Sequence, residues 1–180
     1  VHALGEALAE HVVRSLAAGQ PAEASALLHW PTLLLEPDVE PGWLQADALS
    51  RALWTLNDEV VWEAIISGVG RTPEPQVWRG PLFTLTLAMA PAAVHDIITF
   101  AAALPHVGMR SAVADGVSLL AERAGIKPAL LLGEATGEGL KVALLAVARS
   151  QDATLIEPLL SHVASKDADI REAALIALRR

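Results

Sequence analysis

The six histidines are the residues of this chain that could bind a metal ion or exchange protons near neutral pH. They are His2, His11, His29, His95, His106 and His162. No two of them stand four residues apart around a carboxylate, which is the spacing that binds zinc in HExxH helices. His95 adjoins Asp96, but adjacent side chains diverge on a helix. The histidines therefore predict surface or boundary positions and no metal site.

A short acidic segment is the second candidate set of metal ligands. Glu36, Asp38 and Glu40 alternate with other residues around Pro37 and Pro41. Calcium sites bring several carboxylates together around a tight glycine turn, and three charges without that turn do not make such a site. We interpret this segment as a solvated loop.

The sequence contains no recognisable nucleophile for covalent catalysis. The chain contains no cysteine, and no serine stands in a Gly-x-Ser-x-Gly motif. The segment 133–139 is rich in glycine, but it lacks both the preceding strand and the Lys-Ser/Thr pair of a phosphate-binding loop. The sequence thus predicts a non-enzymatic protein with no catalytic residue and no cofactor.

The composition is that of a folded, aliphatic domain. Hydrophobic residues make up 53% of the 180 residues and charged residues 19%, which excludes disorder. Aromatic residues are only 4% and tyrosine is absent, so the core is expected to be rich in alanine, which favours helices that approach closely. Few charges and high apolarity also favour self-association.

No membrane span is predicted, although the mean hydropathy of +0.41 is high. The longest apolar segment, 77–103, is interrupted by Arg79, Pro81, Pro91, His95 and Asp96. The start, Val1-His2-Ala3, shows no signal peptide and no initiator methionine, so the chain is expected to be a fragment. The absence of cysteine fits a reducing compartment, and a cytoplasmic location is expected.

The net charge of −8 argues against nucleic acid as a partner. Binding to phosphates requires clustered Lys and Arg, whereas the 13 basic residues are scattered. The expected partner is another protein.

A basic residue recurs along the chain at an almost constant interval. Arg79, Arg110, Lys141 and Arg171 are separated by 31, 31 and 30 residues, and an apolar residue precedes each of them. A fainter copy starts at Leu44. A period near 30 with apolar positions at helical spacing is typical of a helix pair repeated in line. The expected fold is all-α, a right-handed α-α superhelix.

Each repeat is expected to contain a first and a second helix. The second helices are predicted at 43–57, 76–90, 107–123, 137–150 and 168–180. The first helices are predicted at 58–70, 91–103, 126–134 and 152–164. Residues 1–42 fit the period poorly and are expected to form an atypical helical pair, with helices near 4–16 and 21–35, followed by the acidic loop. Residues 43–180 then form one continuous repeat domain, and further repeats are expected to follow the last helix.

The last repeat carries a family resemblance. Its segments LIEPLLSHV, SKDAD and IREAALIAL resemble the HEAT-like repeats of phycobilisome lyases and bacterial scaffolds. In that family, an Asp of the turn and an Arg of the second helix join neighbouring repeats through a ladder of polar contacts. The resemblance implies this role for Asp169 and Arg171, and for the basic positions Arg79, Arg110 and Lys141. Asp167 is the alternative acidic residue.

Two sets of residues are candidates for binding a partner. If the second helices line a concave face, the repeat alignment brings together a groove of Leu49, Phe83, Thr84, Ala114, Asp115, Leu145 and Leu175. A register shift of one residue would make them core residues instead, since it turns the helix by roughly 100°. All five tryptophans (Trp30, Trp43, Trp54, Trp62 and Trp78) precede residue 79 and form either an interface cluster or part of the core.

The function favoured by these patterns is a scaffold module that binds a partner helix or peptide on its concave face. The alternative, implied only by the resemblance, is an accessory subunit like the bilin lyases, although no residue here matches their chemistry. A repair glycosylase of solenoid type is disfavoured because a basic lining is absent.

Overall fold

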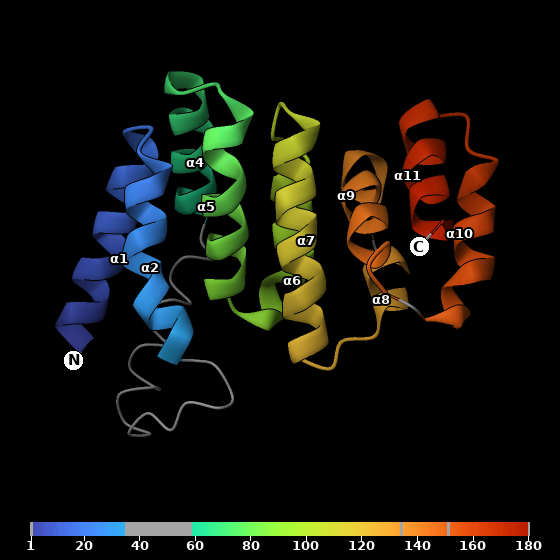
Figure 1. Ribbon diagram of the computed structural model, residues 1–180, viewed down its shortest axis with the longest axis horizontal. Helices are drawn as coiled ribbons and strands as arrows, with labels where there is room; N and C mark the ends of the chain where they lie inside the picture. The colour runs from blue at the N-terminus through green and yellow to red at the C-terminus, as the bar shows by residue number, and fades with distance from the viewer. Residues whose placement is uncertain (1, 35–58, 134, 151, 180) are drawn as a thin grey trace. The chain divides into compact units, whose positions relative to one another are not determined.

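The computed structural model describes residues 2–34, 59–133, 135–150 and 152–179, and all of their regular secondary structure is helical (Figure 1). No strand occurs in these ranges. The prediction of an all-α protein is therefore confirmed. The chain divides into two compact units, residues 1–93 and 94–180. The predicted domain boundary after residue 42 lies outside the described residues.

The first unit contains four described α-helices and a short 3-10 helix: α1 (His2–Ala17), α2 (Pro21–Leu34), α4 (Glu59–Arg71), α5 (Pro75–Ala88) and η2 (Pro91–Ala93). Helix α1 packs against α2 and α4, and α2 packs against α5. Trp62 and Trp78 are fully buried between these helices, so these two tryptophans belong to the core. Trp43 and Trp54 lie outside the described residues.

The contact between α1 and α4 depends on Gly68. A methyl group at this position would overlap the carbonyl oxygen of Leu16 and lie 2.8 Å from the ring of Trp78. The backbones therefore approach more closely than any side chain allows. Beside this contact, Trp78 Nε1 donates to the carbonyl oxygen of Thr72 at 2.7 Å, and Thr72 Oγ1 donates to that of Gly19 at 3.0 Å. These bonds tie the end of α1 to the turn between α4 and α5.

The second unit contains the remaining helices: α6 (Val94–Ala101), α7 (Val107–Arg123), α8 (Pro128–Gly133), α9 (Gly137–Val147), η3 (Ala153–Leu155), α10 (Ile156–Val163) and α11 (Ala168–Leu178). Helix α9 packs against α6, α7, α8 and α11, while α10 packs against α11. The buried residues of α7 recur at intervals of three and four, from Met109 through Val113 and Val117 to Leu120. That spacing places them on one face of the helix.

The predicted helices agree with the observed ones to within a few residues. The range 107–123 is matched, whereas α9 ends at Val147 rather than at residue 150. The first helices predicted at 91–103 and 152–164 each begin with a short 3-10 turn. The helix predicted at 43–57 lies outside the described residues.

Among the described residues, no single helix is both long enough and apolar enough to cross a membrane. The two segments Pro75–Ala88 and Pro91–Ala101 reach that length and composition only when they are counted together, and the chain bends sharply between them.

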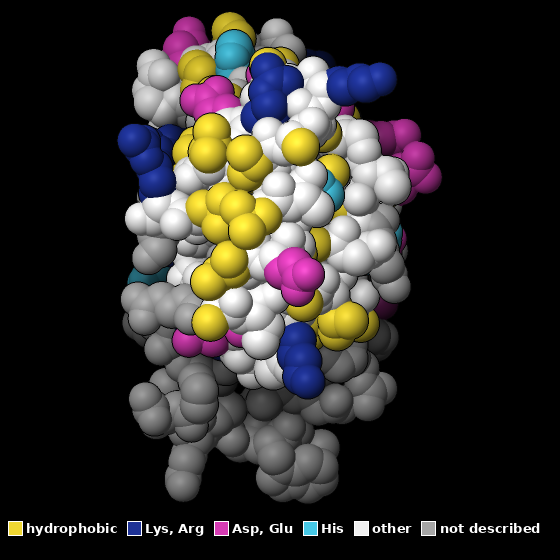
Figure 2. Space-filling model, turned by 90° about the vertical axis from the view of Figure 1, so that its right-hand side faces the viewer, with side chains coloured by type: hydrophobic (Ala, Val, Ile, Leu, Met, Phe, Trp, Pro, Cys, Tyr) yellow, Lys and Arg dark blue, Asp and Glu magenta, His cyan; other side chains and the backbone are white. Residues whose placement is uncertain are grey.

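The C-terminal helix pair exposes large apolar side chains. Ile156, Leu160 and Leu175 have 52%, 55% and 49% of their surface exposed. Figure 2, which faces α10 and α11, shows hydrophobic side chains gathered over this pair. The prediction that further repeats follow stays a prediction.

Candidate binding site

A hollow in the second unit results from two neighbouring helices of unequal length. Helix α7 has 17 residues and α9 has 11. When Arg110 is aligned with Lys141, Val147 corresponds to residue 116, so α7 continues through 117–123 after its neighbour has ended. Seven helical residues extend about 10 Å. The last two turns of α7 therefore overhang the end of α9.

The chain leaves α7 through a turn that depends on glycine. The Ile126 N–H donates to the carbonyl oxygen of Ala121 at 2.8 Å, and the Gly125 N–H donates to that of Glu122 at 3.1 Å. Gly125 has φ +67°, so this is a Schellman motif with glycine in the left-handed conformation. The chain then reaches Pro128, the first residue of α8. This turn forms one wall of the hollow.

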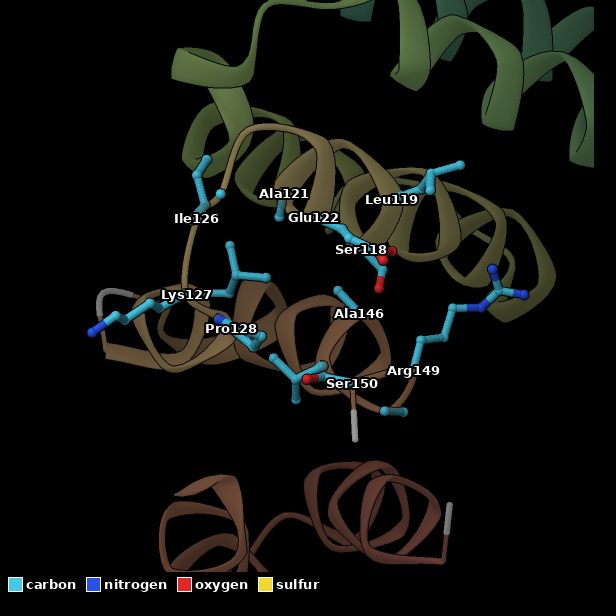
Figure 3. A pocket seen from close by; sticks show the side chains of 14 residues that line it. Ser118, Leu119, Ala121, Glu122, Ile126, Lys127, Pro128, Ala146, Arg149 and Ser150 are labelled. Atoms are coloured by element: carbon cyan, nitrogen blue, oxygen red, sulfur yellow. The ribbon is translucent and has the colours of Figure 1, made fainter. Parts of the chain in front are cut away.

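The hollow is an open pocket of about 870 Å³ between the C-terminal ends of α7 and α9 and the start of α8 (Figure 3). Its floor consists of small or apolar side chains that are buried: Ala121, Leu131, Ala146, Val147 and Ala148. Its rim is partly polar, with Ser118, Glu122, Lys127, Arg149 and Ser150. An apolar floor with a few polar groups at the rim is typical of sites that bind organic ligands or side chains.

The charged groups at the rim differ in what they can offer a ligand. Arg149 Nε lies 2.9 Å from Asp115 Oδ1, so this guanidinium is already paired. Lys127 points away from the gap between α7 and α9 in Figure 3, whereas Ser118 and Glu122 direct their oxygens toward α9. The Glu122 carboxylate makes no hydrogen bond or ion pair with any residue that the structure describes. The pocket therefore offers acceptor oxygens above an apolar floor.

The predicted groove residues are distributed over both units. Phe83 and Thr84 lie on α5 of the first unit and are partly exposed, while Leu49 lies outside the described residues. In the second unit, Leu145 on α9 is partly exposed and Leu175 on α11 is 49% exposed. Asp115 lies on the exposed side of α7, where it pairs with Arg149.

The assignment of Ala114 to a groove is corrected by the structure. This residue is 0% exposed, so it belongs to the core. The partly exposed side of α7 instead carries Ser111, Asp115, Ser118 and Leu119. One residue along a helix turns the side chain by roughly 100°, which is enough to move position 114 from this surface into the interior.

The recurring basic positions are placed in two different ways. Arg110 Nη1 donates to the carbonyl oxygen of Leu104 at 2.6 Å, and Arg171 Nη1 donates to that of Ser165 at 2.8 Å. In each helix pair, the bond runs from the second helix to the residue six positions earlier, which lies just after the end of the first helix. Arg79 is exposed and forms no such bond with a described residue; Trp78 beside it reaches back six residues to Thr72 instead.

Lys141 connects two helix pairs. Its ammonium lies 2.6 Å from Glu138 Oε1, 3.1 Å from Asp169 Oδ2 and 3.3 Å from Asp167 Oδ2, and only 11% of its side chain is exposed. The hydrogen bond that Lys141 donates to the Glu138 carboxylate raises the pKa of Lys141; burial opposes this rise, and the hydrogen bonds to Asp169 and Asp167 add to it. Asp169 and Asp167 belong to the start of α11, so the contact joins α9 to the next pair.

The five polar rim residues of the pocket were not among the predicted site residues: Ser118, Glu122, Lys127, Arg149 and Ser150. A signal for them exists in the sequence, because the segment between Arg110 and Gly125 is longer than the corresponding segment between Lys141 and Ser150. Among the described residues, no group of three or more His, Asp or Glu side chains is placed to hold a metal ion. Comparisons of the chain with protein-family models, with curated proteins and with solved structures found no match.

Proposed function

We propose that this chain is a protein-binding module built from HEAT-like repeats in a right-handed α-α superhelix. The repeated bond over six residues, from Arg110 to Leu104 and from Arg171 to Ser165, supports equivalent helix pairs. The contact of Lys141 with Asp167 and Asp169 supports a polar link between successive pairs. The partner is a helix or an extended peptide that lies across α7, α9 and α11.

The pocket between α7 and α9 is the observation that carries this proposal. It is concave, it opens to solvent, and its floor is apolar and preformed. Interfaces concentrate their binding energy where an anchor side chain fills such a pocket. The partly exposed Leu145 and the exposed Leu175 extend the apolar surface from the pocket along the neighbouring helices.

The test is selection of peptides from a displayed library on the immobilised chain, followed by affinity measurement with individual peptides. The variant Ser118→Trp places a large ring at the rim of the pocket and should weaken binding of the selected peptides at least tenfold. The ring denies the anchor side chain its space, at a position that the core does not use.

The matched control is Ser161→Trp, which introduces the same ring on exposed α10 and should bind the peptides like the wild type. Circular dichroism verifies that both variants keep their helical content. If no peptide is enriched, or if Ser118→Trp binds the enriched peptides as tightly as the control, the proposal is wrong.

A further inference from the structure

The geometry points to a cationic anchor: the pocket between α7 and α9 takes a lysine or arginine side chain of the partner, with its charge on Glu122 and its aliphatic stem on the floor. This inference rests on the proposed function and specifies the chemistry of its anchor residue. The pocket of about 870 Å³ has the Glu122 carboxylate at its rim.

The charges at the rim favour a cation over an anion. The Glu122 carboxylate makes no bond to a described residue and faces the gap. The cation that could otherwise neutralise it from α9, Arg149, is held by Asp115 at 2.9 Å. Lys127 extends away from the gap. An entering ammonium or guanidinium can therefore pair with the Glu122 carboxylate.

The backbone adds to the same preference. Helices α7 and α9 both end at the pocket, at Arg123 and Val147. The C-terminal end of a helix carries a partial negative charge of roughly half an elementary charge, which attracts cations. The hydroxyl groups of Ser118 and Ser150 at the rim are further acceptors for the N–H groups of such a side chain.

The floor suits the methylene stem of a long basic side chain. Ala121, Ala146 and Leu131 are buried and apolar, and they present no polar atom that the stem would leave unpaired. Lys and Arg characteristically bury their stems on apolar surface while the charged head stays at the rim. A carboxylate at the rim and an apolar floor below it are complementary to this arrangement.

The test uses three blocked amino acids as probes: the Nα-acetyl methylamides of lysine, arginine and norleucine. Norleucine keeps the stem of lysine without its charge. The backbone amides of 118–126 and 146–150 are followed by nuclear magnetic resonance as each probe is added. The lysine and arginine probes should shift these amides and bind about threefold to fivefold more tightly than the norleucine probe, which is what an ion pair with a solvent-exposed carboxylate contributes.

The variant Glu122→Gln should remove this difference, so that the lysine and norleucine probes bind equally. Glu157→Gln, an exposed carboxylate on α10, is the matched control and should retain the preference for the cation. The inference is overturned if the norleucine probe binds the wild type as well as the lysine probe does, or if Glu122→Gln keeps the preference for the cation. It is also overturned if the probes shift no amides, or only amides outside 118–126 and 146–150.

The outcomes of this experiment and of the peptide selection are separable. If Ser118→Trp abolishes capture of the selected peptides while Glu122→Gln leaves both capture and the probes unchanged, the module binds peptides but its anchor is not cationic. If the selection itself fails, the proposed function fails irrespective of the probes.

Discussion

At the scale of single residues, the two glycines near the end of α4 experience opposite environments although they are only two positions apart. A methyl group on Gly68 would overlap the Leu16 carbonyl of α1, whereas nothing lies within 4 Å of one on Gly70. The close contact of α1 with α4 therefore depends on one residue. Both glycines lie near the end of the helix predicted at 58–70, and only the packing distinguishes them.

We expect Gly68→Ala to lower the free energy of unfolding of the first unit by at least about 2 kcal/mol, because the helices must separate to admit the methyl group. Gly70→Ala, the control in the same helix, should raise it by up to about 1 kcal/mol through helix propensity. All five tryptophans precede residue 79, so tryptophan fluorescence in urea reports on this unit. Equal midpoints for the two variants would contradict the close contact.

At the scale of helices, Lys141 holds α9 to the start of α11 through two carboxylates, Asp167 and Asp169, and also pairs with Glu138 of its own helix. Asp167 also caps α11, where its side chain accepts hydrogen bonds from the N–H groups of Asp169 and Ile170. The Asp167 carboxylate thus caps the N-terminal end of α11 and also binds Lys141 of α9 in the preceding helix pair. Removing the ammonium leaves three negative groups facing one another.

We expect Lys141→Met to destabilise the chain by about 1–3 kcal/mol near neutral pH, since charged hydrogen bonds at a nearly buried group are lost. Lys166→Met, which removes an exposed ammonium from the adjoining turn, should change stability little. Unfolding in urea followed by circular dichroism measures both. A loss no larger for Lys141→Met than for Lys166→Met would show that the link contributes nothing.

The loss caused by Lys141→Met should depend on pH. The pKa of Lys141 is raised, so its contribution is complete below the ordinary lysine value of about 10.4 and is lost as the pH rises through the raised one. Burial acts to raise the pKa of Asp167, but the N–H groups of Asp169 and Ile170 and the Lys141 ammonium outweigh it and lower this pKa. The stabilisation that ionised Asp167 provides is present above about pH 3.9, the ordinary pKa of aspartate, and is lost as the pH falls through the lowered pKa of Asp167. The difference between wild type and variant should shrink below about pH 4.

At the scale of the whole chain, the charge is distributed unevenly between the two units. Residues 1–93 contain 11 acidic and 4 basic residues, a net charge of −7, whereas residues 94–180 contain 10 and 9, a net charge of −1. The first unit therefore repels polyanions, and the second has no excess of positive charge. Several basic residues of the second unit are also engaged, among them Arg110, Lys141, Arg149 and Arg171.

We expect no binding to double-stranded DNA or to single-stranded RNA at about 50 mM salt, because neither unit can replace the counterions of a phosphate backbone. Fluorescence anisotropy of labelled oligonucleotides measures this directly. Saturable binding that weakens with added salt would contradict the expectation and would require a basic surface that the charge distribution does not indicate.

The sequence by itself determined the helical class and most of the described helix limits. The reason is local: apolar residues at intervals of three and four, together with glycine and proline at the ends, specify a helix without reference to its neighbours. The same periodicity located Arg110 and Arg171 at equivalent positions, and both reach back six residues in the structure.

Only the tertiary structure decided which side of each helix remains exposed and where a cavity forms. Ala114 differs from Asp115 by one position along α7, yet one is in the core and the other at the surface, because burial depends on which neighbours surround the helix. The pocket exists because α7 continues beyond the end of α9, and a difference in length between two helices becomes a cavity only when they pack side by side. Arg149 at the rim is held by Asp115, a pairing between residues 34 positions apart that no local pattern encodes.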